Sequence, residues 1–146
     1  MIAPNIALGD YKVFDLLEQA GAEIVAEDIT EGVRAYDHNV EMNGKDLYEA
    51  LAVKYLRNRV PGAFMRYSLK PRFDHMLALA KELHVQGIIW YQLKMCETYD
   101  IESTYFARHL KEHHLPMLKL DSEYDVSDRG PIKTRIEAFL EGIERR

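Results

Sequence analysis

Two hydrophobic periodicities alternate along this chain, and that alternation restricts its fold class more than any other feature. Segments with apolar residues at spacings of three and four, typical of amphipathic helices, are separated by short apolar runs typical of buried strands. The clearest run is GIIWYQL at residues 87–93, and the helical stripe that leads into it consists of Phe73, Met76, Leu77, Ala80 and Leu83. Helices and strands alternating over short connections predict an open, doubly wound α/β sheet, parallel, with helices on both faces.

The other elements follow the same alternation. Helices are expected after Asp10, which can cap residues 13–20, at residues 47–55 and 101–112, and after Pro131. Gly21 supplies the left-handed stop of the first helix, and strands are expected at residues 23–29 and 117–120. Residues 1–3 leave almost no room for a strand before the first helix. This suggests that the sheet lacks its first strand and that the chain is a fragment or has an obligate partner.

Composition narrows the class of protein. With 146 residues, 47% of them hydrophobic, residues 1–146 are expected to form one domain with its own core. A net charge of -5 with dispersed Lys and Arg argues against nucleic-acid binding, and no apolar run approaches the ~20 residues that cross a membrane. A single cysteine and a start without a secretory signal favour the reducing cytoplasm.

The single cysteine, Cys96, follows the predicted strand at residues 87–93. It would therefore lie at the carboxyl end of a strand, where open α/β sheets place their chemistry. An iron-sulfur cluster or a structural zinc needs about three or four ligands, so a metal role requires ligands from another chain or from a missing part of this one. The alternative is a buried free thiol that packs as a small apolar side chain.

The common nucleotide and zinc motifs are absent from the sequence. Gly9 stands alone without a Gly-x-Gly-x-x-Gly cradle, so a turn before the helix is expected there, and there is no Walker lysine loop. None of the six histidines falls in a His-Glu-x-x-His frame. His109 and His113 are four residues apart near a predicted helix end, and we expect them to be solvated surface residues.

Arg135 falls early in the last predicted helix, where the helix dipole favours acids rather than a cation. A structural ion pair with Glu123, Asp121 or another nearby acid would account for it. The functional alternative is a charge clamp for a carboxylate, a phosphate or a partner chain.

Several segments together resemble a known family. The main segments are GIIWYQLKMC at residues 87–96, LPMLKL at 115–120 and KTRIEAFLE at 133–141, of which the parts around Cys96 and at 134–139 are the most specific. LGDYK at 8–12, GAEIVAED at 21–28 and RFD at 72–74 also fit. From about Pro4 onward the chain resembles the C-terminal part of subunits of the 2-hydroxyacyl-CoA dehydratase and benzoyl-CoA reductase family.

The resemblance implies a cofactor and site residues. Subunits of that family hold a [4Fe-4S] cluster between α/β domains on three cysteines, and Cys96 matches the last of these ligands. Gln92 and Arg135 would be neighbours of the site. The chain departs from the family pattern in lacking the upstream half with the other two cysteines, and in having Pro131 where a glutamine usually follows the glycine. The second departure weakens any site role for the loop at Gly130.

The resemblance also implies a reaction and partners. In the dehydratases an ATP-driven activator protein injects one electron, the cluster passes it to the acyl-CoA thioester, and the resulting ketyl radical anion expels the hydroxyl group. Alone, this chain is expected to be inactive, because the other ligands lie in the remainder of the subunit or in a partner subunit. The alternatives are a benzoyl-CoA reductase subunit, which reduces an aromatic ring, and a non-catalytic interaction module that has lost the cluster.

Overall fold

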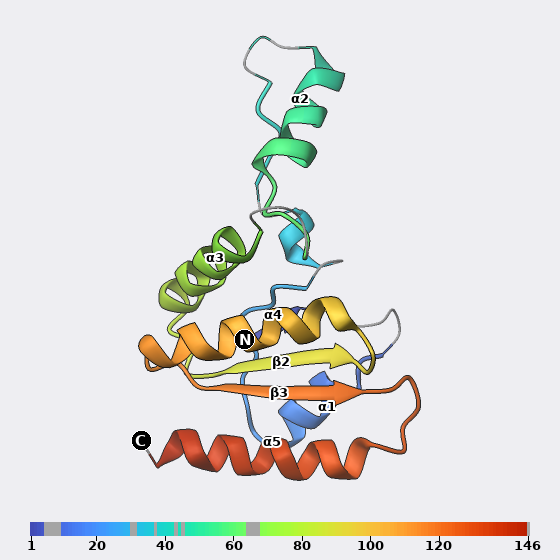
Figure 1. Ribbon diagram of the computed structural model, residues 1–146, viewed down its shortest axis with the longest axis vertical. Coiled ribbons are helices and arrows are strands. Elements are labelled where there is room, and N and C mark those ends of the chain that lie inside the picture. Colours follow the sequence, from blue (N-terminus) through green and yellow to red (C-terminus); the bar gives the residue numbers. More distant parts are fainter. Residues whose placement is uncertain are drawn as a thin grey trace.

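The computed structural model describes residues 1–4, 10–29, 32–36, 38–42, 44, 46–63 and 68–145. The elements in chain order are β1 (Ile2–Pro4), α1 (Lys12–Gln19), the 3₁₀ helix η1 (Val33–Ala35), α2 (Leu47–Val53), the π-helical turn η2 (Lys54–Asn58), α3 (Leu69–Glu82), β2 (Ile88–Leu93), α4 (Glu97–Glu112), β3 (Met117–Ser122) and α5 (Arg129–Glu144). Figure 1 shows how they are arranged.

The strands form one open, parallel sheet in the order β1-β2-β3. Ile2 of β1 is paired with Ile89 of β2, and Trp90 of β2 is paired with Lys119 of β3. Helices lie in both connections, because parallel neighbours need a crossover to return the chain to the same end of the sheet. The predicted α/β class and parallel sheet are confirmed.

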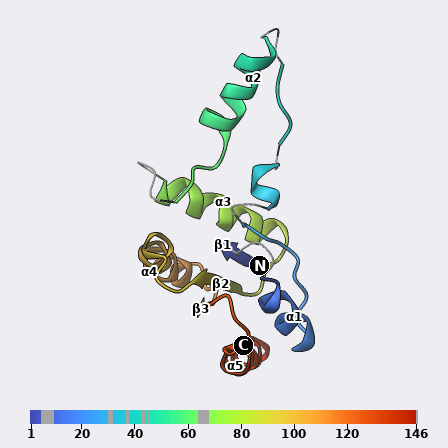
Figure 2. The ribbon, with the colours of Figure 1, turned by 90° about the vertical axis from the view of Figure 1, so that its right-hand side faces the viewer.

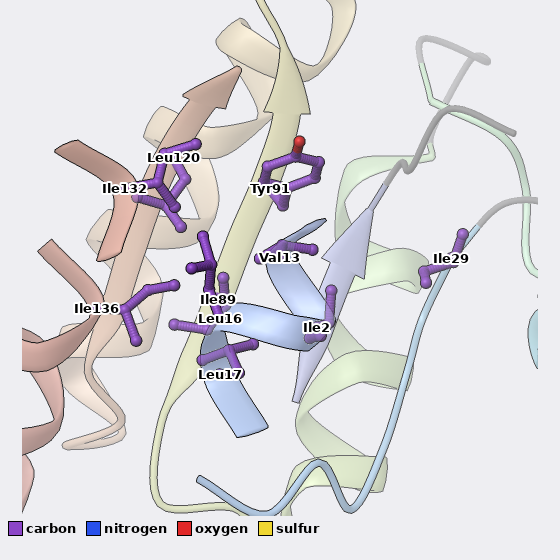
Figure 3. Close-up of a cluster of buried hydrophobic side chains, with 10 residues drawn as sticks. All are labelled: Ile2, Val13, Leu16, Leu17, Ile29, Ile89, Tyr91, Leu120, Ile132 and Ile136. Carbon is purple, nitrogen blue, oxygen red and sulfur yellow. The ribbon is translucent and has the colours of Figure 1, made fainter. Parts of the chain in front are cut away.

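The middle strand, β2, is buried on both faces, which explains its uninterrupted apolar sequence. Ile89 and Tyr91 point toward α1 and α5, where they join the cluster drawn in Figure 3. Ile88 and Trp90 point the other way and pack with residues of α3 and α4. Helices therefore cover both faces of the sheet, as the doubly wound fold requires (Figure 2).

The beginning of the chain differs from the prediction. Ile2–Pro4 forms β1, so the first strand is short but present, and the expectation that the sheet lacks it is wrong. Residues 23–29 do not form the predicted strand but make a single parallel bridge between Glu27 and Ile2. The Ile2 N–H donates to the Ala26 carbonyl (3.1 Å), and the Asp28 N–H donates to the Ile2 carbonyl (2.8 Å). Because β1 has only three residues, it offers residues 23–29 few backbone groups for pairing, and they form a bridge rather than a strand.

The other predicted boundaries shift by a few residues. α4 begins directly after Cys96, and β3 continues to Ser122. Gly21 has φ +82° and ends the first helix as predicted, but the residue that caps this helix at its start is Tyr11 rather than Asp10. The turn predicted at Gly9 lies outside the described residues.

α2 and η2 stand away from the α/β body, as Figure 1 shows. Their side chains include Tyr48 and Leu56, each 83% exposed. In the ranges given above, no helix is long and apolar enough to span a membrane.

Candidate functional site

Cys96 lies where the middle strand ends and a long helix begins. β2 ends at Leu93, and the Cys96 N–H donates a hydrogen bond to the Leu93 carbonyl (3.2 Å), which closes a tight turn. Cys96 is the N-cap residue of α4, and its carbonyl accepts a hydrogen bond from the Asp100 N–H (3.0 Å). The structure places this residue at the carboxyl edge of the sheet, where the sequence predicts it.

The Cys96 side chain is half-buried and belongs to no disulfide. It packs against the apolar cluster that contains Trp90 and Tyr99. Met95, directly before it, has φ +63° and a side chain that is 97% exposed. This left-handed conformation costs a residue other than glycine about 1–2 kcal/mol. Cys96 is thus packed against the core on one side, partly exposed as a residue, and adjacent to a strained turn.

Cys96 can supply one ligand to a metal centre but not a complete set. Across the described ranges, no group of three or more His, Cys, Asp or Glu side chains is arranged to hold a metal ion. His109 is half-buried rather than solvated, because it packs between aromatic rings. The centroid of its ring lies 4.1 Å from that of Tyr105 and 5.7 Å from that of Phe73. Its Nδ1 lies 2.8 Å from the Tyr105 carbonyl oxygen. The aromatic contacts give this histidine a structural role.

Gln92 is buried near the same end of β2, with 1% of its surface exposed. Its side-chain oxygen accepts a hydrogen bond from the Trp90 indole Nε1 (2.9 Å), two residues earlier on the same face of the strand. Its side chain also interacts with the Asp100 carboxylate, whose pKa is lowered mainly by a hydrogen bond from Lys119. Gln92 therefore links the end of β2 to the first turn of the helix that Cys96 caps.

Arg135 lies apart from Cys96, on α5. This helix packs on the face of the sheet opposite the cluster that Cys96 contacts. Arg135 Nη2 donates a hydrogen bond to the Lys119 backbone carbonyl (2.5 Å), and the Arg135 side chain is exposed. Among the described residues no acid forms an ion pair with Arg135, and Glu123 and Asp121 contact lysines instead, so the predicted ion pair with one of these or another nearby acid is wrong.

A buried ionic cluster that the sequence analysis missed lies beneath the start of α4. Asp28, Arg34, Arg72 and Glu102 are each at most 2% exposed. Arg34 Nη1 lies 3.5 Å from Asp28 Oδ1, and Arg72 Nε lies 3.1 Å from Glu102 Oε1. Burial raises the pKa of both carboxyl groups, although the neighbouring arginines oppose this effect. His75 borders the same cluster, with its Nε2 4.0 Å from Asp28 Oδ1.

The sequence does contain a signal for this cluster. Arg72 precedes Met76 and Ala80 at intervals of four, so it occupies a core position of the α3 stripe. Glu102 is likewise four residues before the buried Phe106 of α4. A charged residue at an apolar-stripe position indicates a buried pair or a site.

A second polar network fixes the loop at residues 123–128, on the other face of the carboxyl edge. Lys12 Nζ donates to the carbonyls of Glu123 (2.5 Å) and Asp125 (2.6 Å) and to Asp128 Oδ1 (2.8 Å). Burial opposes ionisation of Asp128 most strongly, but hydrogen bonds from Lys12, Ser122 and the Glu123 N–H outweigh it and lower the pKa of Asp128. The loop is therefore tied to the start of α1.

Nearby, Tyr91 donates its hydroxyl hydrogen to Asp10 Oδ2 (2.6 Å). Burial is the main cause that raises the pKa of Tyr91, and this hydrogen bond raises it further. The other oxygen of Asp10 accepts weakly from the Lys12 N–H (3.4 Å). Asp10 therefore connects β2 with the start of α1.

Comparison with known proteins identifies the family. The family model for the 2-hydroxyglutaryl-CoA dehydratase D-component matches residues 3–143. A protein of Escherichia coli (strain K12) named as a dehydratase subunit, YjiM, is 31% identical over 131 residues, which are 89% of this chain and 33% of the relative. The beta subunit of (R)-2-hydroxyglutaryl-CoA dehydratase from Acidaminococcus fermentans is 25% identical over 122 residues, 82% of this chain and 32% of the relative. The chain thus spans about a third of the length of these relatives. It belongs to the 2-hydroxyglutaryl-CoA dehydratase D-component family.

Proposed function

We propose that this chain forms one α/β domain of a cytoplasmic 2-hydroxyacyl-CoA dehydratase and contributes Cys96 as one thiolate ligand of a [4Fe-4S] cluster. The reaction would be removal of water from a 2-hydroxyacyl-CoA through a ketyl radical of the substrate. The remaining ligands would come from the remainder of the subunit or from a partner subunit. An ATP-dependent activator protein would be a further partner.

One observation carries the proposal: the only cysteine of a dehydratase-family chain is a half-buried free thiol at the carboxyl edge of the sheet. The surroundings fit one corner of a shared cluster, because Cys96 is packed against the core but only half-buried. A ligand set completed by other domains also agrees with the lack of a three-residue metal group among the described residues. When bound, the cluster would supply single electrons at low potential.

The residues of this chain would hold and tune the site. The turn that ends at Cys96 orients the thiol. The Trp90 indole fixes the side-chain oxygen of Gln92, which leaves the amide group to face Asp100 and the first turn of α4. Hydrogen bonding and burial around a ligand cysteine are the means by which a protein sets a cluster potential. We include Gln92 in the site on this ground. Arg135 remains a more distant candidate, because it lies on the other helix layer.

The test is the iron and acid-labile sulfide content of the protein purified anaerobically with its co-purifying polypeptides. We expect roughly four of each per cluster, lost in Cys96→Ser and retained in Met95→Ala, which alters the adjacent, exposed position. Full iron content in Cys96→Ser would contradict the ligand assignment. A complex without iron under these conditions would favour a non-catalytic interaction module. Loss of water from a 2-hydroxyacyl-CoA, rather than reduction of benzoyl-CoA, would establish the dehydratase branch.

A further inference from the structure

Arg72 is a fully buried cation near the start of α3, and its side chain contacts residues of other segments. Its Nε lies 3.1 Å from Glu102 Oε1, and its guanidinium carbon lies 6.0 Å from the centroid of the Tyr99 ring. Its Nη1 donates to the Pro61 carbonyl (3.3 Å) in the segment before α3. Arg72 is 0% exposed, so these contacts are made away from solvent.

The two α4 residues that contact Arg72 lie within the two turns that follow Cys96. Tyr99 and Glu102 follow Cys96 by three and six residues and lie on the buried face of the first two turns. The Tyr99 ring also lies 6.5 Å from that of Trp90, in the cluster against which Cys96 packs. Over one or two turns an α-helix is rigid, because its backbone hydrogen bonds fix the relation between successive turns. Contacts that fix Tyr99 and Glu102 therefore also fix the N-cap residue of this helix.

Stability alone is a poor explanation for an ion pair at this place. Taking two charges out of water costs about as much as their attraction returns, and a well-packed apolar pair of similar volume is often equally stable or more so. An ion pair differs from an apolar contact in its response to movement, because moving either partner away leaves a buried charge without compensation. The pair of Arg72 and Glu102 therefore suits a role in geometry.

We propose that Arg72 is a positioning residue for Cys96: through Glu102 and Tyr99 it fixes the first turns of α4 and thereby the direction of the thiol. This inference rests on the proposed function, in which Cys96 must meet ligands held by other parts of the enzyme. A shared metal site requires its supporting residues to hold each ligand within about 0.5 Å of its working position.

The rate at which Cys96 reacts with iodoacetamide tests this role without any cluster. The full chain, with the subunits that co-purify with it, is freed of iron with a chelator and labelled under native conditions. The peptide that contains Cys96 is then quantified by mass spectrometry. We expect Arg72→Met to raise the labelling rate on the order of tenfold. This corresponds to a free energy of local opening that is lower by about 1.4 kcal/mol.

Two variants separate positioning from stability. Lys12→Met breaks another buried ion pair, with Asp128 on the far face, and should leave the labelling rate of Cys96 within about twofold of the wild type. The double variant Arg72→Met/Glu102→Met removes both charges, so we expect the urea midpoint to recover while labelling stays fast. If the double variant regains both the wild-type urea midpoint and the wild-type labelling rate, the proposal is overturned. This test holds even if Arg72→Met alone fails to fold. Wild-type iron content is measured separately, so a protein without iron would refute the proposed function and leave the labelling result standing.

Discussion

Lys12 offers the clearest test of how the carboxyl edge of the sheet is held together. Its ammonium group is at the start of α1 and donates to two loop carbonyls and to Asp128 at 2.5–2.8 Å. The residue is 4% exposed, and the Asp128 side chain is 17% exposed. Lys12→Met keeps the apolar stem but removes the charge and all three donors. Breaking a buried ion pair by removing one partner costs about 3–5 kcal/mol.

We expect a loss near the lower end of that range, about 3 kcal/mol, because the two carbonyls belong to exposed loop residues and can be rehydrated. Urea unfolding of the full chain, followed by circular dichroism, measures the change as a shift of the midpoint at constant slope.

Lys94→Met is the matched control, since Lys94 also reaches Glu123 (Nζ to Oε1, 2.7 Å), but both side chains are about half exposed. Exposed pairs of this kind add little to stability, so no measurable midpoint shift is expected. Equal shifts for Lys12→Met and Lys94→Met would refute the argument that burial makes the Lys12 contacts important.

Two further predictions concern pH and packing. Because the pKa of Asp128 is lowered in the folded protein, its stabilising contribution is complete above the unfolded value of about 3.9 and is lost as the pH falls through the folded value. Urea midpoints between pH 6 and pH 2 should fall less in Asp128→Asn than in the wild type, and an unchanged fall would contradict this. Gly87→Ala places a methyl group 2.6 Å from Ile143 Cδ1 and should destabilise by about 1–3 kcal/mol in a thermal melt. Its control, Gly142→Ala on α5, meets no atom within 4 Å and should stabilise by up to about 1 kcal/mol; the opposite order would refute the packing argument.

The layer structure could be predicted from the sequence because burial is encoded locally. The run at residues 87–93 predicts β2, and the stripes on either side predict α3 and α4, since each element carries its own periodicity. The position of Cys96 at the carboxyl edge followed from the end of that run. The short first strand was missed because three residues carry too little pattern, and its position depends on pairing with the distant Ile89.

The polar contacts were predicted less well, because a charged residue does not specify its partner. Arg135 bonds to the Lys119 backbone carbonyl, and any residue at that position would offer the same carbonyl. The pairing of Arg72 with Glu102 depends on how α3 and α4 cross, which neither helix encodes alone. The sequence shows that these charges occupy core positions, and only the fold shows which of them meet.

The two buried ionic networks occupy one end of the sheet, on opposite faces. Lys12 ties α1 to the loop after β3, and Arg72 ties α3 to the start of α4. The middle of each helix layer is held by apolar contacts instead. Apolar contacts tolerate small sliding movements because they lack direction, whereas a buried ion pair resists separation because each charge would lose its partner. Contacts that resist movement are thus concentrated where the strands end and Cys96 begins α4, which is the arrangement that a thiolate shared with ligands from elsewhere would require.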